Sequence, residues 1–214
     1  MRIEVAPGTS RGPAYRVESE RLVMRCWEPG DAAALRASLD RSDAHLRPFI
    51  PFMKDEPRSF QATVTRVRQH RAAFDRDEHY RYAVFDPAER TLIGEMLLLD
   101  RRQTGEREVG YWIDVDQCGN GFATEGTAAM TRLAFDLDGV DRVDLHCDPR
   151  NLGSAALARK LGFIHEATLR RRFTDNAGVL RDTMIWTMFR SGFADSAAAA
   201  VEVTAFDCLG TRLL

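Results

Sequence analysis

The stretch that decides the fold runs from residue 110 to residue 125 and reads Gly110-Tyr-Trp-Ile-Asp-Val-Asp-Gln-Cys-Gly-Asn-Gly-Phe-Ala-Thr-Glu125. Its first part is apolar and aromatic, which is typical of a strand, and its second part holds two glycines and a helix start. Glycines let backbone N–H groups approach an anion closely, and the new helix adds its positive end. The stretch therefore predicts a strand, a glycine turn and a helix start that together bind phosphate.

A second segment, Asp148-Pro-Arg-Asn-Leu-Gly-Ser-Ala-Ala-Leu-Ala-Arg-Lys-Leu-Gly-Phe163, predicts a strand end followed by another helix. Asn and Ser are favoured where a helix begins, and glycine is favoured just after it ends. The two segments together place a phosphate-bearing ligand beside a helix that carries polar groups.

This combination resembles the GNAT superfamily of N-acetyltransferases, and within it the RimJ/RimL type, which acetylates protein N-termini. Three matches carry the resemblance, which covers roughly residues 18 to 191. The family's strand and pyrophosphate loop are matched by Gly110 to Ile113 and Gly119 to Glu125. Its second signature is matched by Asn151-x-x-Ser154 and Lys160 to Phe163, and its first strand by Glu20 to Arg25. Each match alone is a short pattern, whereas their order and spacing make the combination specific.

The resemblance implies an α/β fold with a central, mostly antiparallel mixed sheet and helices on both faces. In the GNAT fold, the strands near 110–115 and 142–147 run parallel but splay apart, and acetyl-CoA enters the gap. The splay would leave backbone groups of Ile113 and Val115 free to bond the pantetheine arm. The implied acetyl-CoA site is therefore Ile113, Val115, Cys118, Gly119, Asn120, Gly121, Phe122, Ala123, Thr124, Asn151 and Ser154.

Two positions of this site have other readings. Cys118 stands where the superfamily often has Gln or Arg and where the RimJ/RimL type usually has an aromatic residue. Backbone contacts from the loop should survive this change, although the loop could also be a plain strand-to-helix turn. Asn151 could act only as a helix cap.

Composition sets limits on the class of protein. The chain has 214 residues with 44% hydrophobic and 29% charged content, enough for one domain with a full core. A net charge of −2 gives no argument for nucleic-acid binding. The four cysteines form no CxxC pair or metal-ligand spacing, and no apolar run reaches membrane length. The N-terminal residues lack a continuous apolar h-region, so we expect no signal peptide. We expect a cytoplasmic protein without a metal.

Periodicity predicts the order β, α, α, β, β, β, α, β, α, β, β, which indicates a mixed sheet. Residues 1–17 are expected to be an irregular lead-in, 18–191 the acetyltransferase domain, and 192–214 an extension of unknown role. This extension joins a homodimer interface or packs on its own domain. The expected strands are 20–27, 80–86, 91–100, 106–115, 142–147, 165–173 and 181–190. The expected helices are one that the Asp31 side chain caps, one over 58–76, one that follows the glycine turn and one over 151–161.

The catalytic groups depart from the wider superfamily. Many members carry a tyrosine in the second helix that protonates the departing thiolate, but Ala158 stands at that position. Ser154 is the polar substitute, as in the RimJ/RimL type, and its hydroxyl would hydrogen-bond the developing thiolate. The candidates for a general base are Glu108, Glu95, His146 or a water molecule. Glu108 resembles the acidic residue that commonly precedes Gly-Tyr-Trp.

These features predict an enzyme that moves an acetyl group from acetyl-CoA to a primary amine by direct attack in a ternary complex. The resemblance favours a protein or peptide α-amine, and the alternative is a small-molecule amine such as a polyamine or aminoglycoside. A non-catalytic acyl-CoA sensor remains the alternative of another class. Three charged or apolar segments have two interpretations each. Arg150, Arg159 and Lys160 reach the CoA 3′-phosphate or form a solvated helix face, Arg170 to Arg172 guide an acidic acceptor or form a polar strand edge, and Pro48 to Met53 form part of the acceptor wall or of the core.

Overall fold

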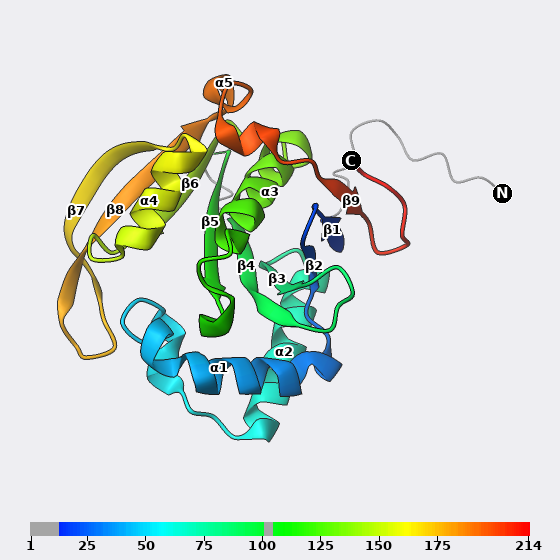
Figure 1. The fold of residues 1–214 in the computed structure, drawn as a ribbon, viewed down its shortest axis with the longest axis vertical. Helices are drawn as coiled ribbons and strands as arrows, with labels where there is room; N and C mark the ends of the chain where they lie inside the picture. The colour runs from blue at the N-terminus through cyan, green and yellow to red at the C-terminus, as the bar shows by residue number, and fades with distance from the viewer. Residues whose placement is uncertain (1–12, 101–104) are drawn as a thin grey trace.

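The computed structural model describes residues 13–100 and 105–214, which form one sheet of nine strands with helices packed against it (Figure 1). The strand order is β7-β8-β6-β5-β4-β3-β2-β1-β9, and β5–β6 is the one parallel pair within the described ranges. The strands are β1 (Arg16–Glu18), β2 (Val23–Cys26), β3 (Tyr80–Phe85), β4 (Leu92–Asp100), β5 (Glu106–Ile113), β6 (Arg142–Cys147), β7 (Ile164–Thr174), β8 (Leu180–Phe189) and β9 (Thr204–Phe206). This confirms the predicted mixed, mostly antiparallel sheet.

Helices cover both faces of the sheet, as predicted. They are α1 (Ala32–Leu46), α2 (Phe60–Asp75), α3 (Phe122–Asp136), α4 (Leu152–Leu161) and the short α5 (Arg190–Phe193). Because strand side chains alternate, Tyr82 and Val84 of β3 join the core under α3 and α4. Ala83 and Phe85 join the second core, which is built with α1 and α2.

The parallel strands separate along their length. The ladder between β5 and β6 ends at the pair Glu108 and Asp144, although β5 continues to Ile113 and β6 to Cys147. Beyond that point β5 pairs only with β4, and β6 pairs only with β8. The sheet therefore opens between its two middle strands, and the N-terminal ends of α3 and α4 lie on the same side of this opening (Figure 1).

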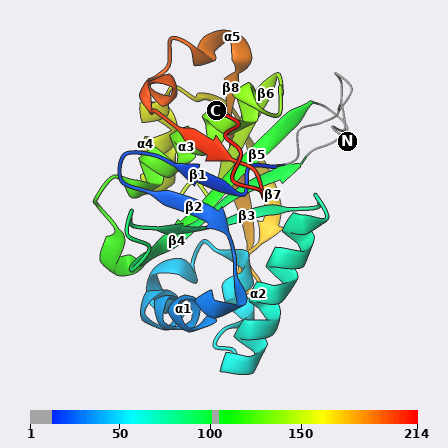
Figure 2. The ribbon, with the colours of Figure 1, turned by 90° about the vertical axis from the view of Figure 1, so that its right-hand side faces the viewer.

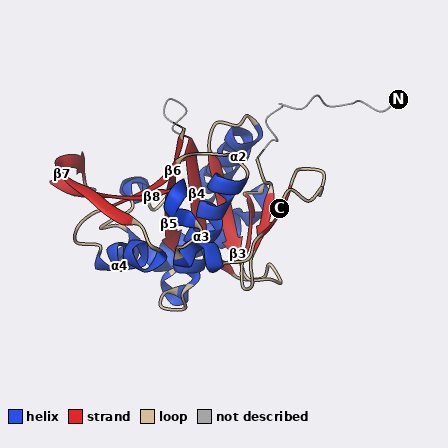
Figure 3. Ribbon diagram, turned by 90° about the horizontal axis from the view of Figure 1, so that it is seen from above, coloured by secondary structure: helices blue, strands red, loops and turns tan. Residues whose placement is uncertain are grey.

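A long hairpin of β7 and β8 reaches beyond the rest of the sheet (Figure 3). At its tip, the Asn176 side-chain amide donates to the carbonyl oxygens of Arg47 at 2.7 Å and Ile50 at 3.1 Å. These bonds join the hairpin to the segment that follows α1, so the two walls of the opening are fixed to each other. The predicted turn at Asn176 to Gly178 is confirmed, since Gly178 donates its N–H to the Asp175 carbonyl.

The N-terminal end of the chain differs from the expectation, and the C-terminal end takes one of the two roles expected for it. Arg16 and Val17 belong to β1, whereas the lead-in was predicted to be irregular through residue 17; residues 1–12 lie outside the described part. The C-terminal extension adds β9 beside β1 as an antiparallel edge strand, and the two lie together in Figure 2. The extension therefore packs on its own domain, the second of its two predicted roles.

Two local predictions were also wrong. Asp31 precedes α1 but does not cap it, because its carboxylate accepts hydrogen bonds from Arg25 and from the Glu28 N–H. The strand predicted to reach residue 115 ends at Ile113, because Asp114 starts a short 3-10 turn over Val115–Gln117. The buried Asp114 carboxylate holds this turn by accepting from Ser38, from Arg41 and from the Asp116 N–H.

Candidate active site

A cavity of about 440 Å³, the first cavity, lies at the opening between β5 and β6. The end of α1, strand β5, the glycine turn and helix α4 form its walls. Eight of the eleven residues predicted to bind acetyl-CoA line it: Ile113, Cys118, Gly119, Gly121, Ala123, Thr124, Asn151 and Ser154. The other three, Val115, Asn120 and Phe122, lie between the end of β5 and the first residue of α3 but do not line the cavity.

The glycine turn has the backbone that an anion site requires. Gly119 and Gly121 both have a φ of +82°, a left-handed conformation that glycine adopts without a steric penalty. The first helical bond of α3 runs from the Glu125 N–H to the Gly121 carbonyl. The N–H groups at residues 122–124 therefore precede the internal bonds of the helix and are available to a ligand at its positive end.

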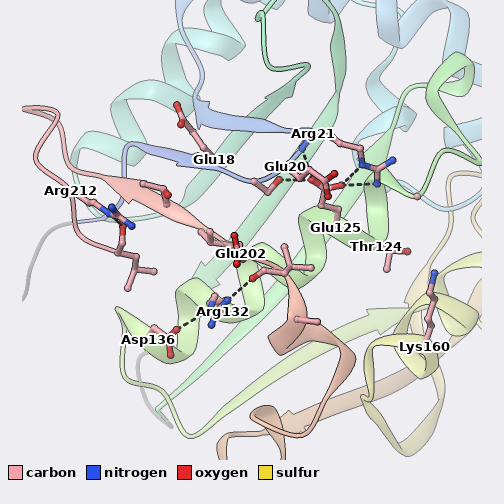
Figure 4. A pocket seen from close by; sticks show the side chains of 17 residues that line it. Glu18, Glu20, Arg21, Thr124, Glu125, Arg132, Asp136, Lys160, Glu202 and Arg212 are labelled. Carbon is pink, nitrogen blue, oxygen red and sulfur yellow. Dashed lines mark hydrogen bonds and ion pairs between the residues drawn. The ribbon is translucent and has the colours of Figure 1, made fainter.

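Arg21 and Glu125 fix the glycine turn to the first two strands (Figure 4). The Glu125 carboxylate accepts from the Ser19 hydroxyl, the Arg21 N–H and the Arg21 Nε, all within 2.9 Å. Arg21 also donates to the Asn120 carbonyl at 2.9 Å. The sequence places Arg21 in the first-strand motif but indicates no role for its side chain, because its partner Glu125 lies more than one hundred residues along the chain.

The cavity drawn in Figure 4 has a volume of about 1410 Å³ and shares Gly121, Thr124 and Lys160 with the first cavity. Of the three basic residues assigned to the CoA 3′-phosphate, Lys160 is the one that lines these cavities. Arg150 pairs with Asp148 at 2.6 Å, and the Arg159 guanidinium lies 5.7 Å from the Trp186 ring centroid.

The backbone of β5 faces the opening at alternate residues. The Asp114 N–H donates to the carbonyl of Ile93, a residue of β4. Asp114 and Trp112 therefore direct their backbone N–H and C=O groups toward β4. Tyr111 and Ile113 direct theirs the other way, where β6 has already separated. The prediction for Val115 was wrong, because its N–H donates to the Ser42 hydroxyl at 3.0 Å.

Ser154 lies in the first turn of α4 and is 7% exposed. Asn151 caps this helix, since its side-chain oxygen accepts the Ser154 N–H at 3.1 Å. The Tyr111 hydroxyl donates to Ser154 Oγ at 3.1 Å. The sequence does not predict this contact, because an aromatic residue in a strand gives no sign of which distant hydroxyl it meets. Ala158, at the position of the usual tyrosine, is fully buried.

A second cavity of about 790 Å³ adjoins the first, and the two share Phe49, Ile50, Tyr111 and Trp112. Four residues of the predicted acceptor wall line it, from Phe49 to Phe52, as do Leu169, Phe173 and Ile185 of the hairpin. Of the Arg170 to Arg172 run, Arg172 is the residue that lines this cavity.

Acidic side chains occupy one wall of the second cavity. Glu106, Glu108 and Asp144 all line it, and Glu108 Oε2 lies 3.4 Å from His146 Nδ1. Burial raises the pKa of Asp144. Two of the predicted base candidates, Glu108 and His146, are thus in contact with each other at the same cavity.

Glu95, the third candidate, also lines the second cavity but is 2% exposed and already bonded. Its carboxylate accepts from the Trp27 indole at 2.8 Å, the Trp112 indole at 3.3 Å and Arg81 at 2.8 Å. These three donors occupy the oxygens that a base would use, so the geometry argues against Glu95 as the base.

A glycine turn at a helix start, a splayed parallel pair and an adjoining cavity with a carboxylate–histidine contact together indicate the class of acyl-CoA-dependent transferases. The acetyltransferase (GNAT) domain model matches residues 21–164, and the chain belongs to this family. It is an N-acetyltransferase that uses acetyl-CoA.

Known relatives agree with this placement. The probable N-acetyltransferase YjcK of Bacillus subtilis is 29% identical over 122 residues, which are 56% of this chain and 67% of YjcK. RimL, a ribosomal L7/L12 alpha-N-protein acetyltransferase solved with coenzyme A, superposes with a TM-score of 0.72 at 19% identity, over 80% of this chain and 95% of RimL. Mycobacterium smegmatis RimJ superposes with a TM-score of 0.72 at 22% identity, over 88% of this chain and 90% of RimJ. The fold is thus that of the RimJ/RimL-type enzymes.

None of the helices among residues 13–100 and 105–214 is long and apolar enough to cross a membrane. Within the same ranges, no group of three or more His, Cys, Asp or Glu residues is placed to hold a metal ion.

Proposed function

We propose that the protein acetylates the α-amine of a protein or peptide, by direct attack on acetyl-CoA in a ternary complex. The observation that carries the proposal is the junction at Tyr111, where the first cavity, with its glycine turn, meets the second, with its acidic wall. A thioester in the first cavity and an amine in the second would meet at this point, and such positioning supplies much of the rate of acyl transfer.

On the donor side, we assign the CoA pyrophosphate to the N–H groups at residues 122–124 and the pantetheine arm to the β5 backbone at Tyr111 and Ile113. A backbone N–H of β5 would also stabilise the tetrahedral oxyanion. Acetyl-CoA supplies the activated acetyl group, and backbone groups and side chains of this chain supply the binding contacts, the hydrogen bonds and the base.

On the acceptor side, we assign Glu108 as the base that takes a proton from the attacking amine, directly or through water. Its contact with His146 holds the carboxylate at the cavity wall. The neighbouring Glu106 and Asp144 add negative character, which favours the approach of an ammonium group. The apolar wall from Phe49 to Phe52 suits the side chains of a peptide better than a polyamine, which needs acidic partners along its whole length.

CoA or acetyl-CoA is expected to stabilise the fold by about 2.7 kcal/mol at 100 times its dissociation constant, because ligand that binds only the native state adds to the free energy of unfolding. The measurement is a thermal shift with increasing CoA, with sodium sulfate at matched ionic strength as the control. An unchanged melting temperature at millimolar CoA would show that the glycine turn does not bind the nucleotide.

Ser154→Ala is expected to lower kcat about tenfold while the affinity for CoA largely persists. Removing one hydrogen bond to developing charge costs up to about 2.7–4 kcal/mol in a preorganised site, and water replaces part of a lost serine hydroxyl. Steady-state kinetics with a working acceptor gives kcat, and calorimetry gives the affinity for CoA. A variant with the kcat of the wild type would remove Ser154 from the reaction.

The acceptor itself is tested by a panel assayed for thiol release from acetyl-CoA. The panel holds a peptide with a free α-amine, the same peptide blocked at that amine but carrying a lysine, a polyamine and an aminoglycoside. The highest kcat/KM is expected for the free α-amine. Faster reaction of the polyamine or aminoglycoside would favour the small-molecule alternative, and CoA binding without thiol release from any member would favour a sensor.

A further inference from the structure

The hydroxyl of Tyr111 lies at the junction of the two cavities and has no part in the mechanism above. Tyr111 belongs to β5 and lines both the first and the second cavity. Its hydroxyl donates to Ser154 Oγ at 3.1 Å, across the opening between the strands. The contact thus joins the strand that faces the pantetheine arm to the first turn of α4.

The hydrogen bond restricts what the Ser154 hydroxyl can do. A serine hydroxyl has one hydrogen to donate and two lone pairs, and it rotates to suit its neighbours. Once Tyr111 donates to one lone pair, the serine hydrogen is left to point at another acceptor. The Ser154 N–H bonds Asn151 at 3.1 Å, so the backbone that carries the hydroxyl is fixed as well.

Tyr111 keeps its hydroxyl hydrogen at neutral pH, so it can donate to Ser154. Burial raises the pKa of Tyr111 to about 12, so the phenol stays protonated at neutral pH. Donation from Tyr111 also polarises the Ser154 O–H bond, because successive hydrogen bonds strengthen one another in a medium of low dielectric constant. Cys147, at the end of β6, is a further neighbour of Ser154, and burial raises the pKa of its thiol.

We infer that Tyr111 is a positioning residue, which orients and polarises the Ser154 hydroxyl so that its hydrogen meets the departing CoA thiolate. The Tyr111–Ser154 pair, contributed by β5 and α4, supplies the hydrogen bond that the superfamily tyrosine gives from the position of Ala158. When the C–S bond breaks, its electron pair stays on sulfur and Ser154 donates to it, while Glu108 keeps the proton of the amine. The inference rests on the proposed transfer reaction.

The kinetic test compares Tyr111→Phe, Ser154→Ala and the double variant. Tyr111→Phe is expected to lower kcat about tenfold and to leave the KM for acetyl-CoA within twofold, since the ring keeps its place and one hydrogen bond is lost. The double variant should be no slower than Ser154→Ala alone, because Tyr111 acts only through Ser154. Tyr82→Phe is the matched control: it removes a buried hydroxyl that bonds the Ala14 carbonyl at 3.0 Å, and should leave kcat unchanged.

A second measurement needs no acceptor. The pKa of the bound CoA thiol is followed by thiolate absorbance, with the desulfo-CoA complex as the blank. Tyr111→Phe should raise this pKa by about one unit, equivalent to about 1.4 kcal/mol, because the hydrogen bond from Ser154 to the thiolate is weakened. Ser154→Ala should raise it at least as much, and Tyr82→Phe should not move it.

The outcomes separate this inference from the proposed function. The inferred role of Tyr111 would be overturned if Tyr111→Phe kept the wild-type kcat, left the thiol pKa unchanged or altered KM alone. Full additivity of Tyr111→Phe and Ser154→Ala would overturn it as well. A wild-type protein that lowers the thiol pKa of CoA but acetylates no amine would instead overturn the proposed acceptor reaction and leave the pair standing.

Discussion

Gly121→Asp is expected to weaken CoA binding about a hundredfold, or about 2.7 kcal/mol. Gly121 has a φ of +82°, and a Cβ placed there would lie 3.4 Å from an Arg21 guanidinium nitrogen. An aspartate would therefore place its negative charge against Arg21 at the point where we assign the pyrophosphate. Isothermal calorimetry with CoA gives the affinity of each variant.

Two matched variants test whether the loss of CoA affinity in Gly121→Asp comes from the new charge at the glycine turn. Cys118→Ala changes a neighbouring side chain, and it should leave the affinity for CoA within about threefold because the proposed contacts are made by the backbone. Gly210→Asp repeats the backbone strain at a φ of +76° in the C-terminal extension, away from the first cavity. It should leave CoA binding unchanged. Equal affinity of Gly121→Asp and the wild type would show that the pyrophosphate lies elsewhere.

Glu108→Gln is expected to lower kcat about a hundredfold or more, the usual range for the loss of a positioned base. The amide keeps the shape of the side chain and its place at the second cavity but cannot accept the proton of the amine. Rates are measured at saturating acetyl-CoA and acceptor, so that a change in binding does not enter the comparison.

Glu106→Gln is the matched control for this prediction. Glu106 lies on the same strand and lines the same cavity, but its carboxylate is paired with Arg142. Its loss removes one charge from the acidic wall without removing the proposed base, so we expect a rise in the KM for a cationic acceptor and a small effect on kcat. Comparable losses of kcat in both variants would assign the effect to the electrostatic field of the wall, and a water molecule would become the base.

The parts of the fold that the sequence predicted are those with a local physical cause. The glycine turn follows from residues that tolerate a positive φ next to a helix start, and the start of α4 follows from the capping side chain of Asn151. Strand β9 was missed, because three residues at a sheet edge are recognisable only by their partner, β1, which lies at the other end of the chain.

The same distinction holds for the candidate site. Local patterns placed Gly119, Gly121 and Ser154 at one cavity, whereas the contacts that decide their roles join distant segments. Arg21 meets Glu125, Ser42 takes the N–H of Val115, and Tyr111 meets Ser154. Strand periodicity gives the face on which a side chain lies, but it does not give the partner brought there by the packing of another element.

The most direct test of the central claim is the transfer of a labelled acetyl group from acetyl-CoA to a peptide that carries both a free α-amine and a lysine. The wild-type protein, incubated with both substrates, is predicted to release CoA and to place the label on the α-amine, as located by fragmentation in a mass spectrometer. Glu108→Gln, run in parallel, should label the same position far more slowly. Label on the lysine side chain alone, or release of CoA without any labelled peptide, would contradict the account.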